Sequence, residues 1–322
     1  MTLRVGVIGL GSMGKNHSRV IERTEGLDLV AAYDINLQGK ELDSRPGLLH
    51  SNLNSFLDLN LDYVVNSVST TNHLEISLML AEHKTPMLLE KPIAPTLSDA
   101  KLIIEAFEAK QVKAGVGHIE RYNPALQEAK KRIDQVGDIY QISTYRQGAF
   151  SGRIKDVGVT VDLATHDFDL TQWLVSSGYQ NVFAMGAFAS NQNHEDLVSI
   201  IGKMQNGVIA NHSVNWVSPY KERRVVITGS DGALIADTLT ADLTFYENGS
   251  GAETWSQLAN FRGMREGNVI RYAIEKYEPL KKEHEEFRDF ILGKSQNIVS
   301  LKEATANINV AERVINQLVM DK

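Results

Sequence analysis

The stretch Gly9-Leu10-Gly11-Ser12-Met13-Gly14 decides the fold of the first part of this chain of 322 residues. It matches the pattern G-x-G-x-x-G and lies between an apolar run and a helical pattern. In a dinucleotide-binding unit, the first glycine makes a tight turn, the second lets the backbone approach a pyrophosphate, and the third lets the helix pack closely on the strand. The helix N-terminus then faces the phosphates. An ordinary glycine-rich turn is the alternative, and the flanking strand and helix favour the phosphate-binding loop.

Short apolar runs alternate with helical patterns over about the first 120 residues. The runs are rich in Val, Ile and Leu and lack regular polar–apolar alternation, which is typical of strands buried on both faces of a sheet. Strands are expected at 3–8, 27–33, 63–67, 87–90 and 112–117, and helices at 13–23, 72–83 and 97–110. This alternation predicts an α/β fold with a doubly wound parallel sheet.

The pattern changes after about residue 120. Asn123 and Pro124 open a helix, with proline at its first position. The pairs Asn206-Gly207 and Asp231-Gly232 are typical of β-hairpin turns, so a largely antiparallel sheet is expected. Residues 250–275 are expected to form a loop. Strands are expected at 139–146, 182–189, 197–204, 208–214, 224–228, 233–237 and 243–246, and helices at 161–176, 280–292 and 301–320.

Length and composition predict two domains and exclude several classes of function. A chain of this length is expected to divide into domains 1–120 and 121–322. Lys and Arg number 33 against 40 Asp and Glu, a net charge of −7, whereas nucleic acid requires a basic surface. The absence of cysteine excludes disulfides, cysteine-ligated zinc, iron–sulfur clusters and a cysteine nucleophile. No apolar run reaches the roughly 18 residues of a membrane span, and the N-terminal stretch lacks the features of a signal peptide, so we expect a cytoplasmic protein without membrane contacts.

Asp34 indicates which dinucleotide the chain prefers. It ends the second predicted strand, and an acidic residue at that place accepts hydrogen bonds from the adenosine ribose hydroxyls. A carboxylate there repels the additional phosphate of NADP, and no arginine follows in Ile35, Asn36 or Leu37 to offset it. A solvated turn aspartate is the alternative. We expect NAD as the cofactor rather than NADP.

Four segments further along belong together by their order and spacing. They are Asn66-Ser67-Val68-Ser69-Thr70-Thr71-Asn72-His73, Glu90-Lys91-Pro92, Asp162-Leu163-Ala164-Thr165-His166, and Glu278-Pro279-Leu280 leading into Phe287. These segments resemble the cofactor-covering loop, the E-K-P motif, the D-x-x-x-H motif and the late E-P-L segment of the Gfo/Idh/MocA oxidoreductases. The resemblance implies a Rossmann domain followed by an α/β domain with an open sheet. Because that sheet often forms the oligomer interface in this family, a homodimer or homotetramer is expected.

The resemblance also implies an activity and a set of site residues. Family members use NAD or NADP to oxidise or reduce a carbinol carbon of sugars, inositols and related cyclic compounds. Their catalytic residues correspond to Lys91, Asp162 and His166, and the Lys91–Pro92 peptide bond is expected to be cis. Cofactor contacts are expected from Gly9, Gly11, Ser12, Met13, Gly14, Asp34, Ser67, Thr70, Asn72, His73, Glu90, Lys91 and His118. Substrate contacts are expected from Lys91, Arg121, Tyr122, Asn123, Asp162, His166 and Lys221.

The residue types support this chemistry without the resemblance. Lys91 follows a predicted parallel strand, at the edge where open α/β sheets bind ligands, and an ammonium there stabilises developing alkoxide charge. Asp162 and His166 are four residues apart on a predicted helix and share one face. A histidine can take a hydroxyl proton near neutral pH, with Asp162 or Asp169 as support. The alternatives are a surface lysine at Lys91 and a hydrated His–Asp pair on the helix. A zinc site requires three or four ligands, so no metal is expected.

Two segments bear on the substrate. The stretch His118-Ile119-Glu120-Arg121-Tyr122-Asn123-Pro124 resembles the subset of the family that oxidises UDP-N-acetylglucosamine at its 3-hydroxyl. Trp216 and Pro219, with Lys221 and Arg224, resemble the same subset, and these basic residues have the charge to meet a diphosphate. A basic strand on a solvated face is the alternative, and residues 193–196 are interpreted as a plain hairpin loop.

Three functions follow from these observations. The first is an NAD-dependent oxidoreductase that transfers a hydride between a secondary hydroxyl of a sugar, specifically a nucleotide sugar, and the nicotinamide. The second is a dehydrogenase of a free monosaccharide or inositol, which does not need the basic residues around Lys221. The third is a non-catalytic regulator that senses NAD. The presence of Lys91, Asp162 and His166 favours an enzyme.

Overall fold

The computed structural model describes residues 1–36, 47–150, 157–189, 194–249 and 265–320. The chain forms two compact units. Unit 1 comprises Met1–Tyr122 and Tyr277–Glu312, and unit 2 comprises Asn123–Lys276 and Arg313–Lys322. This division differs from the predicted one because the late helix α7 (Pro279–Ile291) joins unit 1, where Phe287 is fully buried among residues of its sheet.

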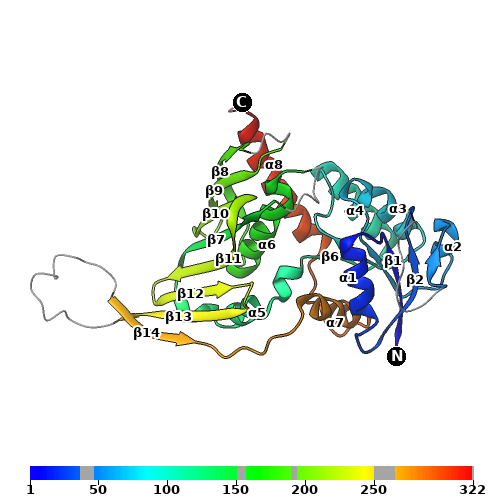
Figure 1. Ribbon diagram of the computed structural model, residues 1–322, viewed down its shortest axis with the longest axis horizontal. Helices are drawn as coiled ribbons and strands as arrows, with labels where there is room; N and C mark the ends of the chain where they lie inside the picture. Colours follow the sequence, from blue (N-terminus) through cyan, green and yellow to red (C-terminus); the bar gives the residue numbers. More distant parts are fainter. Residues whose placement is uncertain (37–46, 151–156, 190–193, 250–264, 321–322) are drawn as a thin grey trace, which may run out of the picture. The chain divides into compact units, whose positions relative to one another are not determined.

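Unit 1 is built on a parallel sheet with strand order β3-β2-β1-β4-β5-β6. Figure 1 labels β1, β2 and β6 of this sheet. Its strands are β1 (Leu3–Ile8), β2 (Leu27–Tyr33), β3 (Leu49–His50), β4 (Tyr63–Asn66), β5 (Met87–Glu90) and β6 (Ala114–Gly117). The order reverses at β1, which pairs with β2 on one side and with β4 on the other. Doubly wound sheets bind ligands outside the carboxyl ends of their strands at this reversal, so the topology predicts where the site lies.

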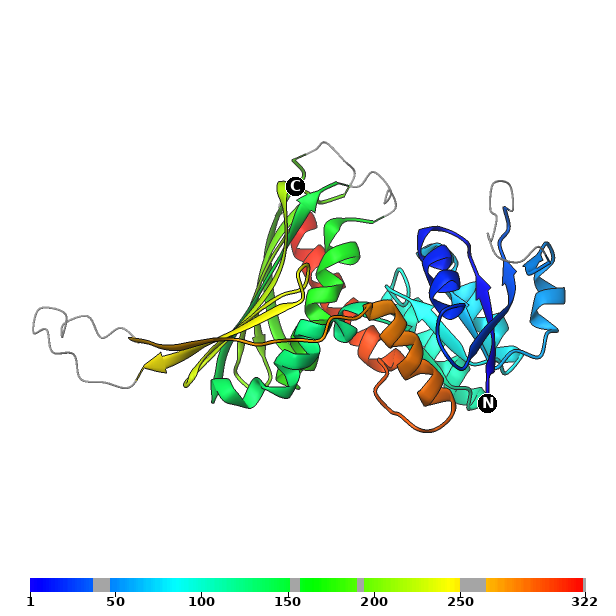
Figure 2. The ribbon, with the colours of Figure 1, turned by 60° about the horizontal axis from the view of Figure 1, so that its bottom comes forward.

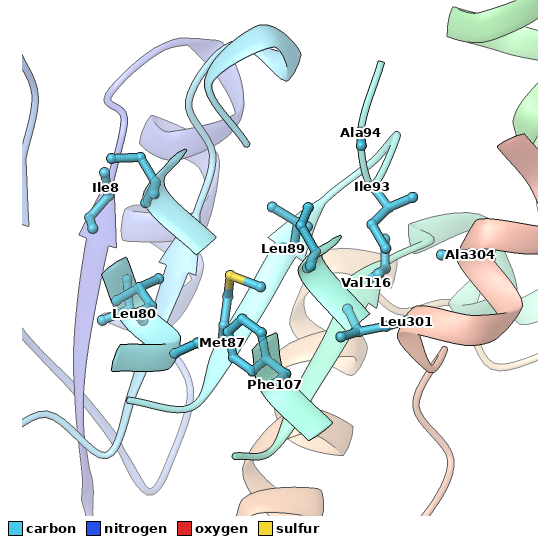
Figure 3. Packing of buried hydrophobic residues seen from close by; sticks show 14 of the residues in the cluster. Ile8, Leu80, Met87, Leu89, Ile93, Ala94, Phe107, Val116, Leu301 and Ala304 are labelled. Carbon is cyan, nitrogen blue, oxygen red and sulfur yellow. The ribbon is translucent and has the colours of Figure 1, made fainter. Parts of the chain in front are cut away.

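Helices cover both faces of this sheet. They are α1 (Ser12–Ile21), α2 (Leu53–Leu57), α3 (His73–Glu82), α4 (Leu97–Lys110), α7 and the first part of α8 (Leu301–Met320), with 3-10 turns η1 (Thr70–Asn72) and η2 (Ile119–Tyr122). Figure 3 shows an apolar cluster that includes Met87 of β5, Phe107 of α4 and Leu301 of α8. The neighbouring residue Leu88 belongs to the cluster that includes Phe287, because successive strand residues face opposite sides.

Unit 2 is built on an eight-stranded sheet with strand order β14-β13-β12-β11-β7-β10-β9-β8. Its strands are β7 (Ile139–Ala149), β8 (Tyr179–Ala187), β9 (Leu197–Met204), β10 (Ile209–Asn215), β11 (Val217–Gly229), β12 (Gly232–Asp237), β13 (Asp242–Gly249) and β14 (Arg265–Arg271). Every neighbouring pair is antiparallel except β10 and β7, which are parallel.

The helices of unit 2 lie on one face of its sheet. They are α5 (Pro124–Lys131), the 3-10 turn η3 (Ile133–Val136), the π-helical turn η4 (Thr160–Ala164) and α6 (Thr165–Val175). Figure 2 shows α5 and α6 on the same side of the sheet. On the other face, Phe183, Met185 and Ile201 are 70%, 75% and 57% exposed. Phe183 of β8 pairs directly with Ile201 of β9, so these side chains share that face.

The predicted fold class, a parallel doubly wound domain followed by an α/β domain with a largely antiparallel sheet, is confirmed. The predicted loop at 250–275 is wrong for 265–271, which forms β14 and pairs with β13, whereas 250–264 lies outside the described residues. The helix predicted at 161–176 begins instead with a π turn at Thr160. In the part of the chain that the structure describes, no helix combines the length and apolar character needed to span a membrane.

Candidate active site

Two glycines of the loop after β1 are required by close approach. Gly9 has a φ of +88°, and a Cβ at this residue would lie 2.6 Å from the backbone nitrogen of Val68. A Cβ on Gly14 would lie 1.8 Å from the carbonyl oxygen of Gly9. The backbone of α1 therefore packs directly on the loop, and neither position accepts a side chain.

Gly11 differs from the other two glycines because space is open around it. Among the described residues, no atom beyond its immediate chain neighbours lies within 4 Å of the position that a Cβ would occupy. Gly11 is the N-cap of α1, and as glycine it supplies no side-chain cap to the first N–H groups of the helix. Ser12 and Met13 form the first turn. A helix N-terminus open in this way fits a phosphate.

Asp34 connects the end of β2 with the glycine loop. Its Oδ2 accepts the backbone N–H of Leu10 at 2.7 Å, and its Oδ1 accepts that of Asn36 at 2.8 Å. A carboxylate has about four acceptor positions, so these two bonds are compatible with further bonds from ribose hydroxyls. The backbone thus holds the Asp34 carboxylate at the glycine loop.

The loop after β4 is fastened to the loop after β1. Ser67 donates its hydroxyl to the carbonyl oxygens of Gly9 at 2.8 Å and Ile8 at 3.1 Å. Thr70 and Asn72 lie in the adjoining turn η1. His73 is buried at the start of α3, and its two ring nitrogens lie 2.9 Å from the Pro92 carbonyl oxygen and 3.2 Å from that of Val68. Burial lowers the pKa of His73. Its ring contacts both the loop after β4 and the loop after β5.

Glu90 and Lys91 follow at the end of β5. The Lys91 backbone N–H donates to Glu90 Oε2 at 3.1 Å, and the Lys91–Pro92 peptide bond is cis, as expected. Glu90 is buried and Lys91 is half-buried. Burial alone raises the pKa of Glu90, but a hydrogen bond from His17 and the charge of Lys91 outweigh it, so the pKa lies below its ordinary value.

A buried chain of hydrogen bonds leads from Glu90 into the interior of unit 1. His17 Nε2 lies 2.7 Å from Glu90 Oε1, and His17 Nδ1 lies 2.9 Å from His284 Nε2. His284 Nδ1 lies 3.1 Å from the Tyr63 hydroxyl. Burial lowers the pKa of His284 well below its ordinary value, and burial raises that of Tyr63. Both side chains are therefore neutral at pH 7.

Glu283 adds a second carboxyl group beside this chain. Within the described ranges, neither of its oxygens has a hydrogen-bond partner, and its side chain is fully buried. A Cβ on Gly117 would lie 3.3 Å from Glu283 Oε1 and 3.6 Å from Glu90 Oε1, so both acids lie against this glycine. Burial and the charge of Glu90 raise the pKa of Glu283 well above its ordinary value. Burial and the neighbouring charge of Glu90 thus favour the protonated form of Glu283.

Sequence reasoning did not single out His17, His284, Glu283 or Tyr63. One signal was available for His284 of α7. Leu280, His284 and Phe287 fall at the spacing of a helix face that packs on a core, and all are buried. A histidine in such an apolar stripe requires a buried partner.

The edge after β6 carries three more of the predicted residues. His118 is buried, and its Nε2 lies 3.5 Å from Asn307 Nδ2. Arg121 donates to Glu303 at 2.9 Å, and Tyr122 donates its hydroxyl to the Asn297 carbonyl oxygen at 3.2 Å. These contacts, all within unit 1, fix the segment between the two units of the chain.

The predicted residues of unit 2 lie on and near α6. Asp162 is in the π turn and His166 in the first turn of α6, and both are buried. The backbone N–H of Thr160 donates to Glu195 Oε1 at 3.0 Å, so a side chain from the loop interpreted as plain supports the start of this helix. A π turn widens the helix locally, and such turns are frequent at functional sites.

A buried ion pair lies beneath α6. Arg146 of β7 donates to Asp167 Oδ1 at 3.0 Å, and both side chains are almost fully buried. Asp169 is buried in the same helix. Sequence reasoning missed this pair, since Arg146 lies in a strand with no other marker of function.

The remaining predicted residues of unit 2 have different environments. Asn123 caps α5, accepting the Ala125 N–H at 3.0 Å and donating to the Thr238 carbonyl oxygen at 2.9 Å. Lys221 is exposed on β11. Arg224 pairs with Glu222 at 3.0 Å and lies over the Tyr145 ring, so its charge is already engaged.

The predicted site residues therefore form two groups. The unit 1 group gathers at the carboxyl edge of the parallel sheet and includes the residues after β1, β2, β4, β5 and β6. The unit 2 group consists of Asp162 and His166 at α6, with Asn123 and Lys221 on other elements. The first group has the form of a dinucleotide site, and the second brings a carboxylate and an imidazole to the start of one helix.

Comparison with known proteins shows which family the two parts of the chain match. Residues 3–118 match the oxidoreductase family with NAD-binding Rossmann fold of the GFO/IDH/MocA group, and residues 126–235 match the GFO/IDH/MocA C-terminal domain. The chain is 26% identical over 257 residues to UDP-N-acetylglucosamine 3-dehydrogenase of Acidithiobacillus ferrooxidans, covering 77% of this chain and 78% of that protein. It is 25% identical over 255 residues to scyllo-inositol 2-dehydrogenase (NAD(+)) of Bacillus subtilis, covering 74% of each. The solved structure of the Acidithiobacillus ferrooxidans enzyme superposes with a TM-score of 0.86 at 24% identity, covering 99% of this chain and 98% of that one.

The fold and both domain matches define an NAD-dependent oxidoreductase. The chain belongs to the Gfo/Idh/MocA family. The residues of unit 1 fit the cofactor, because the open space at Gly11 admits a pyrophosphate at the N-terminus of α1 and Asp34 presents the carboxylate acceptor that a ribose requires.

Proposed function

We propose that the chain oxidises a secondary hydroxyl of a nucleotide sugar with NAD. The observation that carries the proposal is the placement of Lys91 at the carboxyl end of β5, on the edge that holds the glycine loop and Asp34. Bound NAD supplies the acceptor for the hydride that leaves the carbinol carbon. Similarity to UDP-N-acetylglucosamine 3-dehydrogenase and the exposed charge of Lys221 support a substrate with a diphosphate.

Different residues remove the proton of the substrate hydroxyl and stabilise the charge that develops on its oxygen. His166 takes the hydroxyl proton, and Asp162 orients the ring of His166. The Lys91 ammonium donates a hydrogen bond to the substrate oxygen and stabilises the negative charge that develops there. Arg121, Tyr122 and Asn123 contribute to substrate binding through the segment that joins the two units.

A screen of substrates tests the proposal. Formation of NADH is followed with UDP-N-acetylglucosamine and other nucleotide sugars, free aldoses and inositols. We expect turnover with a nucleotide sugar and little with the free sugar. Turnover with inositols alone would favour the second candidate, which similarity to scyllo-inositol 2-dehydrogenase supports. Tight NAD binding without turnover on any substrate would favour a regulator.

Asp34 supports selection of NAD over NADP. Its carboxylate is held at the loop by Leu10, where it repels a 2′-phosphate. Titration with both dinucleotides is expected to show tighter binding of NAD, by about tenfold or more for one repulsive contact. Replacing Asp34 by Ser together with Ile35→Arg is expected to reverse the preference. Equal affinities in the unmodified protein would contradict this role.

The chain assembles as a cytoplasmic homodimer or homotetramer through the open face of the unit 2 sheet. The exposed, adjacent side chains of Phe183, Met185 and Ile201 support this, since apolar groups gathered on one surface mark an interaction site. Light scattering is expected to give an oligomer for the unmodified protein and a smaller species for Phe183→Glu. Leu102→Glu, at an exposed residue of α4, is the control and should leave the mass unchanged.

A further inference from the structure

The buried chain from Tyr63 to Glu90 has a fixed direction. A neutral imidazole carries one N–H and one acceptor nitrogen, so each histidine can donate at one end and accept at the other. Among the residues the structure describes, His284 is the hydrogen-bond partner of the Tyr63 hydroxyl. If Tyr63 donates to His284 Nδ1, His284 donates from Nε2 to His17 Nδ1, and His17 donates from Nε2 to Glu90 Oε1. Every donor then faces an acceptor.

The opposite direction leaves a buried group unsatisfied. If His17 were an imidazolium, its Nδ1–H would face His284 Nε2, which must then accept. His284 would hold its proton on Nδ1 and donate to the Tyr63 oxygen, and the Tyr63 O–H would lose its acceptor. A buried hydroxyl without an acceptor is costly, since it loses water and gains nothing in return. Hydrogen-bond satisfaction therefore selects the direction from Tyr63 toward Glu90.

We propose that Tyr63 and His284 are positioning residues, which fix the direction of this chain so that His17 donates to Glu90 and holds the carboxylate beside Lys91. This inference rests on the proposed role of Lys91. Glu90 Oε2 accepts the Lys91 backbone N–H, so a rotation of the Glu90 carboxylate would break or distort this hydrogen bond to Lys91. Tyr63 comes from β4, His284 from α7, His17 from α1 and Glu90 from β5, and the chain thus connects four elements of unit 1 with the site.

The other ionisable groups around the chain are compatible with this direction. Glu283 on α7 faces Glu90 and is held protonated by burial and by that charge. Arg288, also on α7, exerts an electrostatic effect on Tyr63 from a more exposed position. With Glu283 neutral, Glu90 and Lys91 are the opposed charges at the end of β5.

The protonated nitrogens are measured directly by ¹⁵N NMR of histidine-labelled protein at pH 7. We expect both His17 and His284 to carry one proton, on Nε2. The signals are assigned by their disappearance in His17→Gln and His284→Gln. An imidazolium at His17, or a proton on Nδ1 of His284, would overturn the proposed direction. This readout does not depend on turnover, so it separates a failure of the chain from a failure of the proposed function.

A pair of tyrosine variants tests the effect on the site. Tyr63→Phe removes only the hydroxyl that sets the direction, and we expect kcat to fall by about 3- to 10-fold with unchanged affinity for NAD. Tyr179→Phe is the matched control, because Tyr179 is a buried tyrosine of unit 2 whose hydroxyl lies 2.7 Å from His212 Nε2. It should lower stability without lowering kcat. Equal kcat losses, or none in Tyr63→Phe, would refute the positioning role.

Two variants of His17 separate hydrogen bonding from charge. Gln offers an amide N–H toward Glu90 but cannot become positive, whereas Leu offers neither a donor nor a charge. We expect His17→Gln to keep kcat within about threefold of the unmodified protein and His17→Leu to lose about tenfold or more. Similar losses in both variants, with NAD affinity retained, would show that an imidazolium at His17 is required and would refute the neutral chain.

Discussion

Each unit buries a tyrosine that is hydrogen-bonded to a histidine, and the two pairs end differently. In unit 1 the chain from Tyr63 ends on the ionised carboxylate of Glu90, next to Lys91. In unit 2 the His212 ring lies between the Tyr179 hydroxyl at 2.7 Å and Thr144 Oγ1 at 2.7 Å. The threonine hydroxyl is uncharged and can either accept or donate. This second chain therefore ends on a neutral group.

Unit 2 also has buried charges near its tyrosine–histidine pair. They are balanced in the ion pair of Arg146 and Asp167 beneath α6. Burial and the nearby charge of Arg146 lower the pKa of His212 to about 3, so its ring is neutral at every physiological pH. The buried histidines of the two units therefore have different roles. In unit 1 a buried histidine transmits a hydrogen bond to the site, and in unit 2 a buried histidine completes the packing behind the helix that carries His166.

The largest expected effect is a loss of turnover when His166 of α6 is replaced. If the tyrosine–histidine pair and the ion pair of unit 2 only hold α6 in place, His166 acts through its own chemistry as the base. His166→Asn should then lower turnover by roughly 10²- to 10⁴-fold and leave affinity for NAD unchanged. The acidic limb of the pH profile should disappear with it. His83→Asn, at an exposed histidine, is the control, and near-normal turnover in His166→Asn would move the proton transfer elsewhere.

Breaking the ion pair beneath α6 tests the structural side of the comparison. Arg146→Met leaves the Asp167 carboxylate buried without its partner and should lower the free energy of unfolding by about 3 to 5 kcal/mol. Arg224→Met, at a half-exposed arginine paired with Glu222, should cost about 1 kcal/mol or less. The double variant Arg146→Met with Asp167→Leu should recover most of the loss. Urea unfolding measures all three, and equal effects at Arg146 and Arg224 would contradict the assignment.

Substitutions of Lys91 test the role of its ammonium group next to Glu90, where the unit 1 chain ends. Lys91→Met preserves the approximate length of the side chain and removes the ammonium, so turnover should fall by about a hundredfold, or about 2.7 kcal/mol. Lys91→Arg should not restore it fully, because a planar guanidinium does not replace a compact ammonium at one oxygen. NAD affinity, set by the glycine loop and Asp34, should stay unchanged. A simultaneous loss of NAD binding would show a role in cofactor binding instead.

The sequence predicts the elements of this fold well because their signals are local. The strands Leu3–Ile8 and Leu27–Tyr33 and the helix Leu97–Lys110 have the predicted bounds. Ser300 and Glu303 exchange reciprocal bonds in a capping box at the start of α8, where a helix at 301–320 is predicted. Each of these features depends on spacing within a few residues.

The buried chain of unit 1 could not be predicted in the same way. His17, Tyr63 and His284 are far apart in the sequence, and only the packing of α1, β4 and α7 brings their atoms within hydrogen-bond distance. No periodicity marks a pair that forms across elements. The π turn at Thr160 is equally nonlocal, since its N–H is held by Glu195 from another loop.

The smallest expected effect concerns Glu283, whose carboxyl oxygens have no hydrogen-bond partner among the described residues, whereas Asp167 near the tyrosine–histidine pair of unit 2 is paired with Arg146. Its pKa in the folded protein lies well above the ordinary value of 4.5, so the folded state holds a proton that the unfolded state releases. Between the two pKa values the folded state binds more protons, and stability therefore falls as pH rises through this window. Glu283→Gln replaces the protonated acid by a neutral group of the same shape and removes this dependence.

The free energy of unfolding of Glu283→Gln, measured in urea, should therefore match that of the unmodified protein near pH 4 and exceed it near pH 8. The difference should be at least about 1 kcal/mol for each pH unit that lies between the ordinary pKa and the raised pKa of Glu283. Glu285→Gln on the same helix is the control, because Glu285 is partly exposed and pairs with Lys281 and Lys282. Its effect should be small at both pH values. If Glu283→Gln and the unmodified protein respond to pH alike, Glu283 is ionised in the fold. Two negative charges would then lie against Gly117, and the balance between Glu90 and Lys91 on which the unit 1 chain depends would be lost.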